Sequence, residues 1–448
     1  MRDLAFVFFL VALLGFGFRR PFLFVLAYAY VDTVSPQRLS YYMLNSVPLS
    51  LIVFALAFLG WLIADDKRGL RLAPRQGLMI LLLAYAAYTT ANADFPVEAA
   101  HKWDWASKAM IFAIFLPLTL GTRLRIEAML LFMTLSAAAI IIVGGIKTAA
   151  SGGGYGVINL MVDNNSGLYE SSTISTVAIA LIPIILWLAR HGTIYPPEWR
   201  VKLFAYALVF ACLLMPVGTV ARTGLVCIVV LAVLQLRHTK RRVLYLAMLG
   251  AAGMLALALV PTGFTERMGT IKDYKSDQSA GTRLAVWAWT WDYAKDHPLG
   301  GGFDAYRANR IQFKTQNTQT SGAVTNVTQE LQQDAGRAYH SSYFEMLGEQ
   351  GFPGLILWLL IHGIGLFRME VLRRRYRADE ARAWVSPLAV ALQHAQIIYL
   401  VGSLFVGIAY QPFVLMLVGV QIGFDQYLRR IGRMRSAQPF AAPIPAAA

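Results

Sequence analysis

The sequence predicts an all-α, polytopic transmembrane helical bundle of about 12–13 spans with one large loop outside the membrane. Of its 448 residues, 57% are hydrophobic and 15% are charged. Apolar runs of about 15–23 residues recur along most of the chain, and such runs are long enough to cross a hydrocarbon layer roughly 30 Å thick. The runs do not alternate between polar and apolar residues, which argues against a transmembrane β-barrel.

Thirteen apolar segments are the candidate membrane spans of this bundle. They cover residues 4–18, 21–33, 47–64, 77–91, 106–120, 127–147, 173–189, 203–220, 224–236, 243–261, 352–368, 386–408 and 412–427. The first two are short and are separated by the sequence Arg-Arg-Pro. Either they form a tight hairpin or one of them does not cross completely.

The basic residues predict the orientation of the bundle. They gather in short links between spans, with the sequences DDKRGLRLAPR, TRLR, RHTKRR, FRMEVLRRRYRADEAR and YLRRIGRMR. Because cytoplasmic links carry an excess of Lys and Arg, these links are expected to face the cytoplasm. Residues 262–342 then lie on the opposite side of the membrane.

This orientation divides the chain into four parts. Residues 1–261 form the N-terminal transmembrane helices, and residues 262–342 form a loop outside the cytoplasm. Residues 343–432 form the C-terminal transmembrane helices. Residues 433–448 have the composition of a disordered tail, which lies in the cytoplasm.

Charge and cysteine content limit the partners and the redox chemistry of the chain. The formal net charge is +15, but the positive residues stand beside spans, where they orient the protein and meet membrane lipids. A nucleic-acid partner is therefore not expected. Cys212 and Cys227 fall in or beside apolar runs, and two buried free thiols are expected.

The loop at residues 262–342 is too long for a simple connector, and loops of such length are usually functional. A helix is predicted from near Thr282 to His297, where Pro298 and three glycines follow. Trp287 and Trp291 are four residues apart and share a face, as in an amphipathic helix at a membrane interface. The Gln-, Thr- and Asn-rich sequence that follows predicts a mobile flap.

Motifs that bind a cofactor or a catalytic metal are missing from the sequence. There is no Walker loop, no H-E-x-x-H, no G-x-S-x-G, no C-x-x-C and no D-x-D carboxylate pair. We therefore expect neither a cofactor nor a metal site, and any chemistry must come from other side chains.

Three charged residues are predicted to lie at one level, at the ends of spans that face away from the cytoplasm: Arg222, Arg283 and His340. Each also has a structural explanation, since an arginine can reach lipid headgroups or solvent and a histidine can cap a helix. Together they suggest chemistry. Two guanidinium groups can hold a pyrophosphate through bidentate bonds, and one imidazole can accept a proton near neutral pH.

Three stretches around these residues, GTVARTGL, GTRLAVWAWTWDYAKDHPLGGGFDAY and AYHSSYFEMLGEQGFPGLILW, resemble the O-antigen ligase/polymerase superfamily of bacterial inner membranes. The shared motifs are an R-x-G at a span end, an Arg-bearing helix that closes in H-P-x-G-x-G, and H-[NS]-x-[YF]-x5-E-x-G. The N-terminal region resembles, more narrowly, the O-glycosylation ligases associated with the exosortase A system. Ser341 departs from the commoner Asn of the last motif.

The resemblance implies a multi-pass protein of the bacterial inner membrane with a periplasmic loop over the active site. It implies transfer of a glycan from undecaprenyl pyrophosphate to an acceptor hydroxyl on a lipid, protein or glycan. By position, Arg222 and Arg283 would bind the pyrophosphate and His340 would activate the acceptor, giving inversion at the sugar carbon without a metal. Lys102 and Lys108 could add positive potential to the donor site, although an interface anchor is the simpler explanation for both.

Two other functions fit parts of this pattern. A polysaccharide polymerase of the same superfamily would use the same donor with a second lipid-linked glycan as acceptor. A transporter of the lipid-linked glycan would place ionisable residues near the middle of the membrane and often shows internal repeats. No repeat is present, and helix–helix hydrogen bonding explains His362 and His394 in the late spans.

Overall fold

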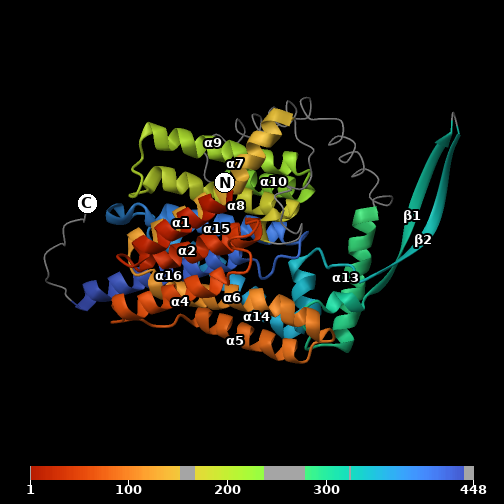
Figure 1. The fold of residues 1–448 in the computed structure, drawn as a ribbon, viewed down its shortest axis with the longest axis horizontal. Coiled ribbons are helices and arrows are strands. Elements are labelled where there is room, and N and C mark those ends of the chain that lie inside the picture. The colour runs from red at the N-terminus through yellow and green to blue at the C-terminus, as the bar shows by residue number, and fades with distance from the viewer. Residues whose placement is uncertain (1, 152–166, 237–277, 322–323, 438–448) are drawn as a thin grey trace.

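The computed structural model describes residues 2–151, 167–236, 278–321 and 324–437. These residues form a bundle of long, roughly aligned helices, with helix α13 lying across one end and a two-stranded hairpin projecting beyond it (Figure 1). The predicted fold class, an all-α polytopic membrane bundle, is confirmed.

Nine of the first ten predicted apolar segments overlap helices that lie before residue 237. They are α1 (Arg2–Gly17), α2 (Phe22–Val34), α3 (Pro36–Leu39), α4 (Leu49–Ala64), α5 (Pro74–Ala91), α6 (Pro96–Thr119), α7 (Arg123–Ser151), η1 (Gly167–Tyr169), α8 (Ser171–His191), α9 (Trp199–Gly218) and α10 (Arg222–Leu236). The predicted span at residues 243–261 lies outside the described residues.

The second half of the chain begins with the elements of the loop and ends with three long helices. They are α13 (Gln278–Asp296), η2 (Ala305–Ala308), β1 (Arg310–Ser321), β2 (Val324–Ala335), α14 (Ser342–Arg375), η3 (Glu380–Arg382), α15 (Val385–Gly402) and α16 (Pro412–Ala437). Because α16 continues to Ala437, the predicted tail overlaps a helix over residues 433–437.

Among the described residues, five helices are long and apolar enough to cross a membrane: α7, α8, α9, α14 and α15. Three further apolar helices, α2, α4 and α10, are shorter. Helices α1 and α2 are separate and pack against each other, so the Arg-Arg-Pro sequence does form a helical hairpin. At 16 and 13 residues, they are shorter than the roughly 20 residues that a perpendicular crossing needs.

Helices α6 and α14 each begin about ten residues before the predicted span. The extra turns hold charged residues such as Glu98, Lys102 and Glu345, which lower the hydropathy without breaking the helix. Hydropathy therefore located the apolar part of each helix and missed its polar start. These polar starts carry an ion-pair cluster that is described below.

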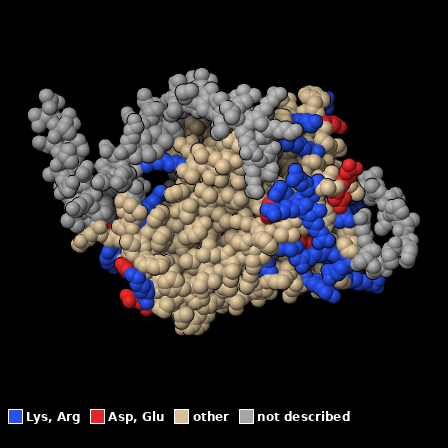
Figure 2. Space-filling view, turned by 180° about the vertical axis from the view of Figure 1, so that it is seen from behind, with Lys and Arg blue, Asp and Glu red and all other residues tan. Residues whose placement is uncertain are grey.

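The surface has the charge distribution of a protein embedded in a membrane. Figure 2 shows one face with a broad uncharged band, and Lys and Arg gather at one end of it. Large apolar side chains such as Phe8, Leu51 and Phe210 are exposed along the helices, where lipid would cover them. We call the end where α8, α14 and α16 finish the basic end, and the opposite end the site end.

Buried polar side chains link four helices inside the bundle. Arg75 donates to the Ile361 carbonyl (2.7 Å) and to Gln421 Oε1 (2.8 Å). Gln421 donates to Gln396 Oε1 (2.9 Å), and Gln396 Nε2 lies 2.9 Å from His362 Nδ1. The expected role of His362 in helix–helix hydrogen bonding is thus confirmed.

The Gln-, Thr- and Asn-rich part of the loop, predicted to be a mobile flap, forms an antiparallel hairpin of β1 and β2. Its mobility stays a prediction. Its register pairs Arg310 with Ala335 and Ser321 with Val324, which leaves two residues between the strands. Thr and Val favour extended backbone, and a glycine at the first of two connecting positions is a hairpin signal. The helix predicted from near Thr282 is confirmed as α13, which begins four residues earlier than expected. That this helix lies at a membrane interface stays a prediction. Both cysteines are free and buried, as predicted.

Candidate functional site

The starts of α8, α10 and α14 and the end of α15 meet at the site end. The Ser342 N–H donates to the Ser403 carbonyl (2.8 Å), which joins α14 to the end of α15. A Cβ added to Gly402 would lie 2.3 Å from Thr176, and one added to Gly224 would lie 2.8 Å from Ser175. These close approaches bring α15 and α10 against the second turn of α8.

Arg222 is the first residue of α10 and is half-buried at this meeting point. The turn before it contains Val220 with a φ of 51°. A β-branched residue in the left-handed region is a backbone outlier, and strain of this kind clusters at functional sites. The Ala221 N–H donates to the Pro216 carbonyl (3.0 Å), which closes the turn and fixes where the Arg222 side chain leaves the backbone.

The position of α13 is set by a glycine clasp, formed by residues 298–302 after α13 and residues 348–352 in α14. Gly301 and Gly302 donate to the carbonyls of Gly348 and Glu349, both at 3.0 Å, and Phe352 donates to the Pro298 carbonyl at 3.0 Å. The clasp holds the end of α13 against the kink in α14.

Gly351 shows why glycine is needed in the clasp. Its φ of 61° and ψ of −167° lie in a region that is essentially restricted to glycine. A Cβ at this position would lie 2.3 Å from the Pro298 carbonyl oxygen. The motifs H-P-x-G-x-G and E-x-G therefore act here through backbone packing, which places Arg283 of α13 relative to the start of α14.

A second contact positions the residue before His340. The indole N–H of Trp287 donates to the Tyr339 carbonyl (2.8 Å), and the Trp287 ring stacks on Phe344 with centroids 5.0 Å apart. Trp287 thus packs on the protein rather than on lipid, whereas Trp291 on the same helix is half exposed. Ser341, the departure from the common motif, is buried at the N-cap position of α14, where its side chain makes no capping hydrogen bond.

His340 is exposed and has a left-handed backbone with φ of 49°. Partial burial of its ring and the positive charge of Arg283 lower the pKa of the imidazole below its usual value of about 6.5. Arg337 acts in the same direction, while the carboxylate of Glu170 opposes both. A lowered pKa favours the neutral imidazole, which is the form that can accept a proton.

Glu170 was missed by the sequence analysis. It caps α8 by accepting hydrogen bonds from the Thr173 N–H (2.5 Å) and hydroxyl (2.8 Å). Its place as an N-cap before an apolar helix was visible in the sequence, but its proximity to His340 depends on tertiary packing. The cap leaves the carboxylate near the imidazole.

Lys102 lies in a buried ion-pair cluster. Its ammonium is 2.7 Å from Glu345 Oε1 and 2.7 Å from Glu349 Oε1. The carboxylates also accept backbone N–H bonds, from Ala409 to Glu345 (3.0 Å) and from Asp304 to Glu349 (3.1 Å). The charge of Lys102 is thus compensated within the protein, which favours a structural role over donor binding.

Lys108 is partly exposed and pairs with Asp104 one turn away on α6, with 2.7 Å between the charged atoms. Exposed pairs of this type contribute little to stability. The contacts of Lys108 fit an anchor at the helix surface, and they place it outside the meeting point of α8, α10 and α14.

Replacing Lys102 with Met is expected to lower the free energy of unfolding by roughly 3–5 kcal/mol, because Glu345 and Glu349 would stay buried without a cation. Thermal unfolding of the purified protein measures this. Lys108→Met is the matched control and should change the melting temperature little. If Lys102→Met unfolded like wild type and only raised the donor KM, Lys102 would be a substrate-binding residue instead.

The structure brings Arg283 into the electrostatic environment of His340, and it places Arg222 at the same end of the bundle, at the start of α10, which packs on α8 and α15. Lys102 and Lys108 stand apart in their own ion pairs. The arrangement places the guanidinium group of Arg283 near the imidazole of His340, and a second guanidinium group, that of Arg222, at the same end of the bundle. Such a site can remove a proton from an alcohol and stabilise a leaving group with negative charge.

Two family models match the chain. Residues 207–359 match the O-antigen ligase family, and residues 1–193 match a family of unknown function (DUF5935). The first match contains Arg222, Arg283 and His340 together with the clasp, and it supports the resemblance to the O-antigen ligase superfamily. Among curated proteins, none matches the chain. The narrower likeness to exosortase-associated ligases stays a prediction.

Proposed function

We propose that this multi-pass membrane protein transfers a glycan from undecaprenyl pyrophosphate to an acceptor hydroxyl at its site end. The match of residues 207–359 to the O-antigen ligase family supports glycosyl transfer by a ligase- or polymerase-like protein. The observation that supports the more specific proposal is the charge of Arg283 acting on His340, at the end of the bundle where α10 begins with Arg222.

In this proposal, His340 accepts the proton of the acceptor hydroxyl as its oxygen attacks the anomeric carbon of the glycan. The bond from that carbon to the pyrophosphate oxygen breaks, and the lipid pyrophosphate leaves with the bonding electrons. Attack from the face opposite the leaving group inverts the anomeric configuration. The lowered pKa of His340 keeps its ring neutral and ready to accept the proton at pH 7.

Arg222 and Arg283 bind the pyrophosphate in this mechanism. Negative charge grows on the leaving group as the bond breaks, so cations aimed at it stabilise the transition state more than the ground state. A guanidinium group presents two parallel donors to phosphate oxygens, which an ammonium group cannot do. No general acid is required, because pyrophosphate is already a good leaving group.

We place the site end in the periplasm of a bacterial inner membrane. Support comes from the basic end, where Arg and Lys gather as in cytoplasmic links. The donor would then reach the site laterally, with its polyprenyl chain in the lipid. The hairpin projects beyond the site end (Figure 1), the side from which a periplasmic acceptor would approach.

Arg222→Lys and Arg283→Lys should each lower kcat/KM for transfer by roughly 10²-fold, because lysine keeps the charge but loses the two-pronged geometry. The assay uses purified protein and a polyprenyl-pyrophosphate-linked glycan. Arg307→Lys is the control, since this exposed loop arginine lies near Glu98 and Asp304 and should be replaceable. If both test variants kept full activity, the two arginines would contribute only positive charge, and bidentate binding of the pyrophosphate would be ruled out.

A further inference from the structure

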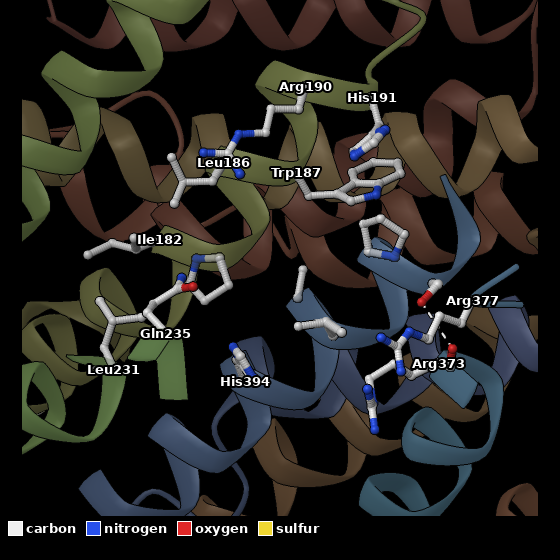
Figure 3. Close-up of a pocket in the computed structure, with 15 residues that line it drawn as sticks. Ile182, Leu186, Trp187, Arg190, His191, Leu231, Gln235, Arg373, Arg377 and His394 are labelled. Atoms are coloured by element: carbon white, nitrogen blue, oxygen red, sulfur yellow. Dashed lines mark hydrogen bonds between the residues drawn. The ribbon is translucent and has the colours of Figure 1, made fainter. Parts of the chain in front are cut away.

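A cavity of about 760 Å³ lies in the basic-end halves of α8, α10, α14 and α15, away from the proposed catalytic residues. Its volume is within the range of about 300–1,000 Å³ that is common for small-ligand sites. Figure 3 shows side chains from these helices around the open space, including Trp187 and His191 of α8 and His394 of α15.

The wall of the cavity changes from apolar to polar toward the basic end. On α8, Ile182, Leu186 and Arg190 line it at a spacing of four residues and therefore share one face. On α10, Leu231 is followed one turn later by Gln235. From Ile182 to Arg190 the helix rises roughly 12 Å, so the apolar wall reaches as deep as several carbons of an acyl chain.

The polar end of the cavity is positively charged. Arg190 and His191 of α8 lie on one side, and Arg373 of α14 and Arg377, which follows that helix, lie on another (Figure 3). Glu370 outside the cavity binds Arg373 at 2.6 Å and 2.7 Å. Within the described part of the chain, no carboxylate lines the cavity or pairs with Arg190 or Arg377.

We propose that this cavity binds an anionic phospholipid of the leaflet at the basic end, with the phosphate near Arg190 and Arg377 and an acyl chain along the apolar wall. A soluble anion would leave the apolar wall unused, and a zwitterionic lipid would gain less from the two arginines. Basic pockets between transmembrane helices on the cytoplasmic side are suited to anionic headgroups.

Three of these four helices carry residues of the proposed active site at their other ends: Glu170 at α8, Arg222 at α10 and His340 before α14. A lipid in the cavity therefore contacts and braces the helices that hold the site. The binding itself is independent of the proposed function and is tested without any turnover.

The experiment measures lipid affinity of the full-length protein, purified in detergent and freed of lipid, by thermal shift and by native mass spectrometry. Phosphatidylglycerol should bind with one lipid per protein and raise the melting temperature. Phosphatidylcholine with the same chains should bind roughly tenfold more weakly, and glycerol phosphate without chains should have no effect.

The double variant Arg190→Gln/Arg377→Gln should lose at least about tenfold in affinity for phosphatidylglycerol. Arg68→Gln/Arg200→Gln removes the same charge at the basic end, away from the cavity, and should bind as wild type does. Equal affinity for the two lipids, equal loss in both double variants, or the absence of lipid binding would overturn the proposal. Saturation by glycerol phosphate alone would identify a soluble anion instead.

Discussion

Replacing His340 with Gln is expected to cut kcat for glycan transfer by roughly 10²–10⁴-fold, the usual contribution of a general base. Glutamine keeps a hydrogen-bonding group but cannot take up the proton. Donor binding should change little, because Arg222 and Arg283 remain. His297→Gln is the matched control, since this exposed histidine of the same loop stacks on Tyr293 and should be dispensable.

The pH profile separates a base from a residue that only positions the acceptor. The rate should rise with pH as His340 loses its proton, and the midpoint should lie below about 6.5 because burial and Arg283 lower its pKa. Glu170 raises that pKa, so Glu170→Gln should move the midpoint to still lower pH. A profile that persisted unchanged in His340→Gln would assign the base to another group.

Replacing Gly351 with Ala is expected to lower the free energy of unfolding by roughly 2–5 kcal/mol and to abolish most transfer. The added Cβ would collide with the Pro298 carbonyl oxygen, and the φ of 61° would be strained for any side chain. The clasp must then open, and α13 with Arg283 would lose its place beside His340. Thermal unfolding and the transfer assay measure the two effects.

Gly363→Ala is the control on the same helix. A Cβ at Gly363 meets nothing within 4 Å, and alanine inside a helix is commonly favourable by about 0.5–1 kcal/mol. The melting temperature of Gly363→Ala should therefore equal or exceed that of wild type. If Gly351→Ala behaved the same way, the clasp would not be what positions α13.

The spans could be predicted from hydropathy because a helix that crosses a membrane is apolar both where it faces lipid and where it faces the core of the bundle. Every predicted span within the described residues overlaps a helix, although α15 ends at Gly402, six residues before the predicted end at 408. The starts of α6 and α14 were missed because Lys102, Glu345 and Glu349 look like loop residues until they are seen paired with one another. Hydropathy averaged along the chain counts every charged residue as polar. It cannot show that a residue on another helix compensates the charge.

That Arg222 and His340 lie at the same end of the bundle followed from the predicted topology alone. An even number of predicted spans separates the two residues, so both are expected on the same side of the membrane. Their detailed environment could not be read from the sequence. The clasp joins backbone groups far apart in the chain, and Glu170 reaches His340 only because α15 packs between α8 and α14. The hairpin was missed because its polar composition hides the β-branched Thr and Val residues.

The central claim is that the site end of this protein performs glycan transfer from a polyprenyl pyrophosphate. It is tested most directly with purified protein in detergent, given a polyprenyl-pyrophosphate-linked glycan and a panel of lipid, protein and glycan acceptors. We predict release of polyprenyl pyrophosphate and a product with inverted anomeric configuration, in a reaction that persists in a metal chelator and is lost in His340→Gln. The acceptor that is used distinguishes a ligase from a polymerase. No product with any acceptor, together with movement of the intact lipid-linked glycan across reconstituted vesicles, would contradict the account and identify a transporter.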